Sequence, residues 1–350
     1  MKPILVAAAL SLLLLTGCWD NKDINHRALP IAMGIGYKNG DYTVYLDIPK
    51  VSASEKGIEV YSEHGKSINE AIDLISMNLE SQVDLLHLKV IVVDKPFALH
   101  GLEEGIASII RSRYIAPKTV FVICDQPLDR FFKRIDDSSN DGKSIYDFFQ
   151  KDAGWSPQIA FTQVWKIFRS VHSYTNDVVL PIIKAGDTTI LESTGSAIMK
   201  NGVMVGRLTN EQTLLYNVFN GDNLMGKIEV MNHATVQIVS NRLRCRGRFQ
   251  QGKPILKSTL YLKVIIVDTT GNPSTEKIKT ELKILVTDRF NEIFKIVRRD
   301  KADIFGLGQH FRDDFSRKEL SQWREKYLPQ LQIELDVKTV VRNTGNLKSP

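Results

Sequence analysis

The spacing of hydrophobic residues predicts alternating strands and helices in the first third of the chain. Ile31–Tyr37 and Tyr42–Ile48 are predicted to be two strands, because they flank Lys38-Asn39-Gly40-Asp41, whose Asn39-Gly40 pair is typical of a tight hairpin. A helix is expected to follow Ser67, because Ser67-Ile68-Asn69-Glu70 forms a capping box before an apolar stripe. The next predicted elements are a strand over Leu86–Val93, a helix over Phe97–Arg113, a strand over Lys118–Cys124 and a short helix over Leu128–Ile135. This alternation predicts an N-terminal α/β domain over residues 31–135.

The pattern changes after residue 135. Residues 136–191 begin with a polar loop and continue with irregular helical periodicity over Ser144–Tyr174, so we interpret them as a connector or second subdomain. A C-terminal α/β domain is expected over residues 192–345. Its predicted elements are strands over Ser196–Met199 and Val203–Leu208, a helix over Asn210–Val218, a long hairpin of Ala234–Phe249 and Ile255–Val267, a long helix over Ser274–Arg299, a helix from Ser316 to Tyr327 and a final strand from Ile333 to Val341. The fold class is therefore mixed α/β (α+β) with several domains, which 350 residues allow.

The first 18 residues have the features of a lipoprotein signal. Lys2 precedes the apolar run Ile4–Leu15, which at 12 residues is shorter than the roughly 20 that a membrane span requires. Leu15-Thr16-Gly17-Cys18 then places small residues before a cysteine, as in signals that end in a diacylglycerol-modified Cys18. An ordinary secretory signal with a chance cysteine is the alternative, but such signals usually end in an Ala-x-Ala-like site. We therefore expect residues 1–17 to be removed and residues 18–30 to form a lipid-anchored tether.

Charge and cysteine content add less to this picture. The formal net charge of +6 is a mild basic excess over 40 acidic residues, and it favours an anionic neighbour such as a membrane surface only weakly. Cys124 lies in a run typical of a buried strand, so a core thiol is favoured over half of a disulfide.

No motif indicates catalysis or metal binding. None of the seven histidines lies in a His-Glu-x-x-His arrangement, no cysteine pair has metal-ligand spacing, and the sequence has neither a Walker loop nor a Gly-x-Ser-x-Gly elbow. Asp137, Ser139 and Asp141-Gly142 match half of a calcium loop, but Phe148 replaces the required bidentate Glu, so a polar loop explains them. Gly306-Leu307-Gly308 follows a helix rather than preceding one, which favours a turn over a phosphate cradle. We predict no catalytic residues, no metal and no cofactor.

One group of charged residues is spaced more regularly than the others. Arg242, Arg244, Arg246 and Arg248 alternate with Leu243, Cys245, Gly247 and Phe249 along a predicted strand. Period two places the four guanidinium groups on one face and directs the Cys245 thiol toward the core. This arginine strip is either a solvated sheet face or a surface for lipid phosphates or an acidic partner, because guanidinium groups bind oxyanions well.

Distinctive motifs occur in both halves of the chain. In the N-terminal half they are Gly17-Cys18-Trp19-Asp20, Gly34-Ile35-Gly36-Tyr37, Gly65-Lys66-Ser67 with Glu70-Ala71, and His87-Leu88-Lys89-Val90-Ile91-Val92. In the C-terminal half they are Ser193-Thr194-Gly195-Ser196-Ala197-Ile198-Met199-Lys200, Val205-Gly206-Arg207-Leu208, Asp303-Ile304-Phe305-Gly306-Leu307-Gly308 and Trp323. With these motifs in this order, the chain resembles the Ger(x)C family of spore germination lipoproteins. We expect Asp303–Gly308 to be a structural turn that docks the last helix and strand onto the C-terminal domain.

The resemblance implies a C subunit of a nutrient germinant receptor on the outer face of the spore inner membrane. Its implied partners are an A subunit with a large soluble part, a polytopic B subunit and membrane lipid, without nucleic acid. The family fold is mixed α/β with three domains. Only Cys18 carries over as a functional residue, because the family is not thought to be enzymatic.

A solute-binding lipoprotein of a membrane transporter is the alternative function. Such proteins are also lipidated and α/β, but they usually consist of two similar lobes of alternating strands and helices. The predicted C-terminal order of hairpin, long helix, helix and strand argues against that arrangement. A surface hydrolase has no support in the sequence.

Overall fold

The computed structural model describes most of the chain after the tether. The described residues are 26–50, 57–112, 114–138, 145–149, 156–221, 227–230, 234–271 and 273–343. The predicted signal peptide, Cys18 and the loop residues Ser139–Gly142 lie outside these ranges. Within these ranges, no helix is both long and apolar enough to cross a membrane.

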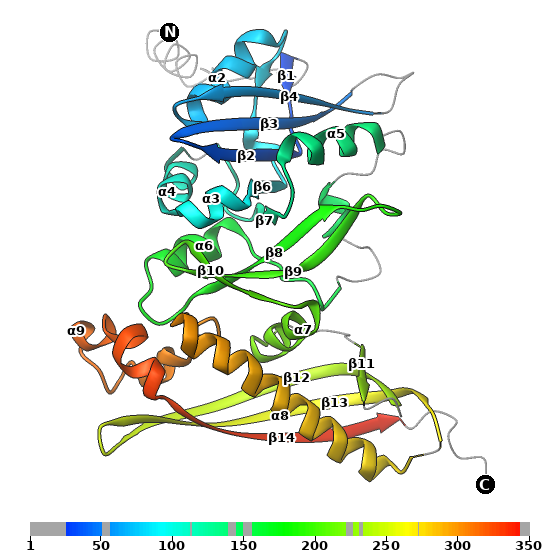
Figure 1. The fold of residues 1–350 in the computed structure, drawn as a ribbon, viewed down its shortest axis with the longest axis vertical. Helices are drawn as coiled ribbons and strands as arrows, with labels where there is room; N and C mark the ends of the chain where they lie inside the picture. Colours follow the sequence, from blue (N-terminus) through cyan, green and yellow to red (C-terminus); the bar gives the residue numbers. More distant parts are fainter. Residues whose placement is uncertain are drawn as a thin grey trace, which may run out of the picture.

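A mixed eight-stranded sheet forms the upper two thirds of the molecule (Figure 1). Its spatial order is β10-β9-β8-β7-β6-β2-β3-β4. The central strands β2, β6, β7 and β8 are parallel neighbours, whereas β3, β4, β9 and β10 join antiparallel to their neighbours. The strands are β2 (Ala32–Lys38), β3 (Asp41–Pro49), β4 (Ile58–Gly65), β6 (Val90–Asp94), β7 (Val120–Cys124), β8 (Val178–Ala185), β9 (Leu191–Lys200) and β10 (Val203–Leu208). A separate short parallel pair consists of β1 (Arg27–Ala28) and β5 (Gln82–Val83).

The predicted β2–β3 hairpin is confirmed. Its turn residues Asn39 and Gly40 have φ values of 54° and 90°, which a two-residue hairpin loop of this kind requires and which Asn and Gly tolerate. The helix after Ser67 is also confirmed as α2 (Ile68–Asn78), and the Ser67 hydroxyl accepts the Glu70 backbone N–H at 3.1 Å.

Helices cover both faces of the eight-stranded sheet. One face packs against α2, α3 (Lys95–His100), α4 (Glu103–Ser112) and α6 (Val164–Val171), whose apolar residues share a core with the sheet. The opposite face packs against α5 (Leu128–Ser138), mainly through Phe131 and Phe132. Both faces of the central strands are therefore buried, which explains their nearly continuous apolar sequences.

Two predicted elements between residues 86 and 113 differ from the structure. The strand expected from Leu86 begins only at Val90, because Leu85–His87 forms a 3-10 turn whose N-cap is Asp84. The helix expected over Phe97–Arg113 is two helices, broken at Gly101, where φ is 125°. Only glycine adopts that conformation readily, so it ends α3 and redirects the chain.

The described part of Ser144–Tyr174 is less helical than its periodicity predicted. It holds a 3-10 turn at Ile145–Phe148 and the short helix α6. Just before α6 the chain runs extended beside β7, where the Phe121 N–H donates to the Thr162 carbonyl at 2.8 Å. Tertiary hydrogen bonds with a strand therefore replace the helix that local periodicity favoured.

The eight-stranded sheet continues through the expected division at residue 192. β8 pairs with β9 from Val178↔Met199 to Ala185↔Leu191, so residues on both sides of this division belong to one sheet. The segment interpreted as a connector supplies β8, and the region assigned to the C-terminal domain supplies β9 and β10.

A four-stranded sheet and a long helix form the lower third of the molecule (Figure 1). The strands lie in the order β11-β12-β13-β14, with bounds Lys227–Val230, Ala234–Gln250, Lys253–Thr269 and Gln332–Asn343. The long hairpin β12–β13 and the long helix α8 (Thr275–Asp300) are confirmed, and the Ser274 side chain caps that helix. The final strand β14 is confirmed and joins β13 in parallel.

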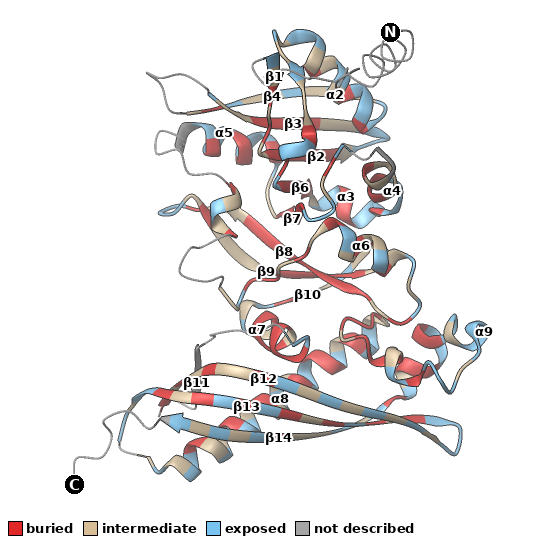
Figure 2. Ribbon diagram, turned by 180° about the vertical axis from the view of Figure 1, so that it is seen from behind, coloured by how far each residue is buried: buried red, intermediate tan, exposed pale blue. Residues whose placement is uncertain are grey.

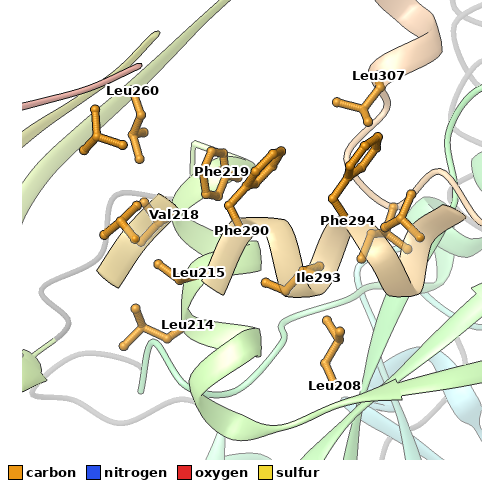
Figure 3. Packing of buried hydrophobic residues seen from close by; sticks show 14 of the residues in the cluster. Leu208, Leu214, Leu215, Val218, Phe219, Leu260, Phe290, Ile293, Phe294 and Leu307 are labelled. Carbon is orange, nitrogen blue, oxygen red and sulfur yellow. The ribbon is translucent and has the colours of Figure 1, made fainter. Parts of the chain in front are cut away.

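The core of this lower unit lies between α8 and one face of the four-stranded sheet. α7 (Asn210–Phe219) packs beside α8, and Figure 3 shows Phe219 and Phe290 meeting there with ring centroids 4.6 Å apart. Leu208 of β10 belongs to the same core, so the cluster also reaches the eight-stranded sheet. The opposite face of the four-stranded sheet carries no helix in Figure 2, and the arginines that β12 places there are exposed.

The last helical region is shorter than predicted. The capping box at Ser316 is confirmed, but α9 spans only Arg317–Leu320. A π-helical turn at Trp323–Tyr327 follows and turns Trp323 into the core.

Candidate interaction sites

The arginine strip lies on the uncovered face of the four-stranded sheet. Arg242, Arg244, Arg246 and Arg248 are all exposed, and the residues between them are half-buried, as period two predicted. At about 3.3 Å per residue, the four side chains extend along roughly 20 Å of β12. The prediction of an outward-facing row is confirmed; its partner stays a prediction.

The charges of this strip are not neutralised within the part of the chain that the structure describes. No carboxylate there forms an ion pair with any of the four arginines. Arg246 lies opposite Lys257, and the Arg244 guanidinium carbon lies 5.4 Å from the Tyr261 ring centroid. Lys338 on β14 approaches the same ring at 5.9 Å. Like charges opposite each other cost stability, as at Arg246 and Lys257, whereas the Arg244 contact with Tyr261 is a favourable cation–π interaction. With no carboxylate paired to it in the described residues, the strip is suited to an anionic surface.

The inward side of the same strand is tightly packed. A side chain at Gly247 would lie 2.5 Å from the His310 carbonyl oxygen, so glycine is required for β12 to approach the turn that follows α8. The Cys245 Sγ lies 3.4 Å from the Ser258 Oγ, and burial raises the pKa of this thiol. Cys124 is fully buried, and burial raises its pKa to about 12. Both thiols are free, which confirms Cys124 as a core cysteine and Cys245 as inward-facing.

A buried polar network connects the eight-stranded sheet to the turn that follows α8. We call it the Asp177–Asp303 network, and it joins the residue before β8 to the turn after α8. The Asp303 N–H donates to the Asp177 carboxylate at 2.7 Å, and the Asp177 N–H donates to the Asp303 carbonyl at 2.8 Å. The Arg324 guanidinium donates two hydrogen bonds, of 2.9 and 2.8 Å, to the Asp177 carboxylate. Both side chains are nearly inaccessible to solvent.

Asp303 fixes the turn that follows it. Its carboxylate accepts the N–H groups of Leu307 and Gly308 and the Trp323 indole N–H, each at 2.8 Å. Burial raises the pKa of Asp303 to about 7, while these three donors act in the opposite direction. Gly306 has φ 64°, and a side chain at Gly308 would lie 2.7 Å from the Trp323 ring. The expectation that Asp303–Gly308 is a structural turn that docks the last helix is confirmed.

Among the described residues, no group of three or more His, Cys, Asp or Glu is arranged to hold a metal ion. Cys18 and most of the calcium-like loop lie outside those residues, so the lipidation of Cys18 stays a prediction.

Comparisons with known proteins agree with the fold and with the motif resemblance. Residues 20–185 match the family model "Spore germination protein N-terminal domain", and residues 194–345 match "Spore germination B3/ GerAC like, C-terminal". Spore germination protein KC of Bacillus subtilis (strain 168) is 22% identical over an alignment that covers 99% of this chain and 96% of that protein. Spore germination protein A3 of the same strain is 20% identical, covering 99% of this chain and 98% of its own length.

A solved structure shares the fold. The crystal structure of the GerBC protein has a TM-score of 0.59 and 15% identity, and covers 89% of this chain and 97% of that one. At this identity the likeness supports the mixed α+β multidomain fold alone. Together with the two family models, it agrees with the sequence motifs, and the chain belongs to the Ger(x)C family of spore germination proteins.

Proposed function

We propose that this protein is a lipid-anchored, non-enzymatic subunit of a spore nutrient germinant receptor, needed for receptor assembly or signalling. The observation that carries the proposal is the match along nearly the whole chain to two spore germination proteins. A match of that extent favours the same role for the whole molecule rather than for one module.

The anchor is a lipid on Cys18. After removal of residues 1–17, the residues up to 30 tether the first strands to the outer face of the spore inner membrane. Two acyl chains give stable attachment, whereas one chain gives only marginal binding. In this arrangement the A and B receptor subunits are the neighbours of the folded part.

The arginine strip is the surface that meets anionic lipid or an acidic face of a partner subunit. Each arginine near an anionic leaflet contributes roughly 1 kcal/mol of attraction, so the four together are substantial where one is not. The exposure of all four and their lack of carboxylate partners in the described residues support this role.

The solute-binding alternative gains no support from the fold. A solute-binding protein would be expected to have two similar lobes, but the two sheets differ in strand number and in connection. The eight-stranded sheet has parallel central strands, whereas the four-stranded sheet is a long antiparallel hairpin with β14 parallel to β13.

Cys18→Ala tests the anchor. The variant is expected to fold normally, because the residues that form both sheets are unchanged, but to lose its membrane attachment and to weaken germination in the nutrient that its receptor senses. Labelling with a radioactive fatty acid should mark the wild type only, and membrane fractionation should find the variant detached or unprocessed. Cys124→Ala is the matched control, because its thiol is buried in the core and should not affect labelling. Equal labelling of the Cys18 variant and the wild type would contradict the proposal.

A further inference from the structure

A polar cavity lies where the two sheets meet. It has a volume of about 330 Å³ and adjoins the Asp177–Asp303 network. Its walls come from α6, from the segment before β8, from the end of α7 and from the turn after α8; Figure 1 shows α7 between the two sheets. Pockets for small molecules begin at roughly 300 Å³, so this cavity has room for a small metabolite.

Two cations on α6 line this cavity. Lys166 and Arg169 lie three residues apart, which places them on neighbouring positions of one helical face. Neither forms an ion pair with a carboxylate of the described residues. The Lys166 ammonium has a long 3.4 Å hydrogen bond to the Phe161 carbonyl, and the Arg169 guanidinium lies 5.2 Å from the Trp165 ring centroid.

The carboxylate that lines the cavity does not neutralise these cations. Asp177 is held by two hydrogen bonds from Arg324 and one from the Asp303 N–H, so its charge is already compensated. The Asn176 amide, with its oxygen turned toward Arg169, accepts a hydrogen bond from that guanidinium at 3.2 Å. The cavity therefore carries an uncompensated positive charge on one wall.

The remaining walls provide hydrogen-bonding groups and aromatic surface. Asn217, Asn220 and Gln309 contribute carboxamides, and the rings of Tyr216 and Phe305 lie 6.1 Å apart by their centroids. Asn217 is held rigidly, because its amide nitrogen donates to the carbonyls of Pro157 and Ile159 at 2.9 and 3.0 Å. Rigid polar walls orient a ligand at low entropic cost.

We propose that this cavity binds a small metabolite that carries a carboxylate or a phosphate group. The anionic group is bound by Lys166 and the planar fork of Arg169, because a guanidinium matches the geometry of both oxyanions. The carboxamide oxygen of Asn217 and the Asn220 side chain bind the polar remainder, because the Gln309 amide already bonds to Thr175 and Arg312. Since the walls come from α6 and the segment before β8 on one side, and from α7 and the turn after α8 on the other, the ligand contacts both units at once.

Calorimetric titration of the purified full-length protein tests this proposal. The probes are inorganic phosphate, glycerol 3-phosphate, malate and glutamate, with glycerol as the uncharged reference. One-to-one binding of at least one oxyanion is expected, and the preferred probe distinguishes phosphate from carboxylate recognition. Lys166→Gln combined with Arg169→Gln should weaken that binding at least tenfold, because two charge-assisted hydrogen bonds are lost.

A matched control separates the cavity from general charge effects. Arg130 and Lys133 are exposed and lie three residues apart on α5, so changing both to Gln removes the same charge elsewhere. This control should bind like the wild type. The fluorescence of Trp165 should respond to the ligand, and Trp165→Phe should remove that signal while retaining the calorimetric binding. Failure of every probe to bind, or equal weakening in both double variants of unchanged melting temperature, would overturn the proposal.

Discussion

Asp47 is the most unusual single residue outside the candidate sites. It lies on β3 with no exposed surface, and neither carboxylate oxygen has a hydrogen-bond partner among the described residues. Burial, assisted by the nearby Asp136, raises the pKa of Asp47 from 3.8 to about 7. The folded protein therefore keeps this carboxyl protonated well into the range where the unfolded chain has released its proton.

Asp47→Asn is expected to change the pH dependence of stability. Between pH 4 and 7 the unfolded state binds fewer protons than the folded state at this site, so the free energy of unfolding falls as the pH rises, and it is flat above pH 7. A shift of this size corresponds to about 4 kcal/mol. Asn resembles the protonated acid, so the variant should lose this part of the slope and be more stable than the wild type at pH 8.

Urea unfolding from pH 4 to 8 measures the effect. Asp303 contributes a slope of the same sign in both proteins, so the difference between wild type and variant isolates Asp47. Asp129→Asn on the exposed side of α5 is the control and should leave the slope unchanged. Identical pH profiles for the Asp47 variant and the wild type would show that Asp47 is ionised in the folded protein.

Residue-level features could be predicted from the sequence only where a local pattern carries them. The arginine strip follows directly from period two, which needs no tertiary information. The burial of Asp47 could not be predicted from the sequence. Thr43, Tyr45 and Asp47 lie on the face of β3 that the sequence pattern assigns to solvent, and only the tertiary fold places α5 over this face. Asp177 and Arg324 are 147 residues apart, and neither lies in a distinctive local pattern.

At the level of elements, capping boxes and turn residues gave the most reliable predictions. Ser67 and Ser316 each begin a helix as expected, because a hydroxyl satisfies backbone donors that would otherwise be free. Predictions that relied on apolar density alone were less accurate. The prediction of a single helix over Phe97–Arg113 was wrong. The hydrophobic periodicity continues across Gly101, but the φ of 125° at this residue is incompatible with a continuous helix.

The arginine strip is expected to serve association rather than folding. Arg244→Glu combined with Arg246→Glu should change stability by less than about 0.5 kcal/mol per substitution, because both side chains are exposed. The same variant should lose co-purification with the receptor A and B subunits, or binding to vesicles of anionic lipid, and the wild-type interaction should weaken with added salt. Arg130→Glu combined with Lys133→Glu on α5 reverses the same charge elsewhere and should not affect either interaction. Normal association of the strip variant, or wild-type association that does not respond to salt, would show that the strip is a solvated face of the sheet and does not bind a partner.

At the scale of the whole molecule, the two units share structure across their junction. The family models separate between residues 185 and 194, close to the division at 192 that composition and pattern predict. β8 and β9 nevertheless pair across this point, and the Asp177–Asp303 network joins the start of β8 to the turn after α8. A sequence pattern locates elements along the chain, but strand partners are set by long-range packing that it does not encode.

A fragment of residues 192–345 is therefore expected to lack a cooperative fold. Removing β8 and the helices that pack on its sheet exposes Met199 of β9, which is now fully buried in their shared core, and deprives Arg324 of Asp177. Each buried aliphatic side chain contributes about 1.5 to 3 kcal/mol, which is a large part of the total stability of a domain. Thermal unfolding followed by circular dichroism should show a broad, gradual change for the fragment and a sharp transition for residues 26–345, which retain both sheets. A sharp transition in the fragment at a similar temperature would instead show that the C-terminal half folds independently and that its contacts with β8 form afterwards.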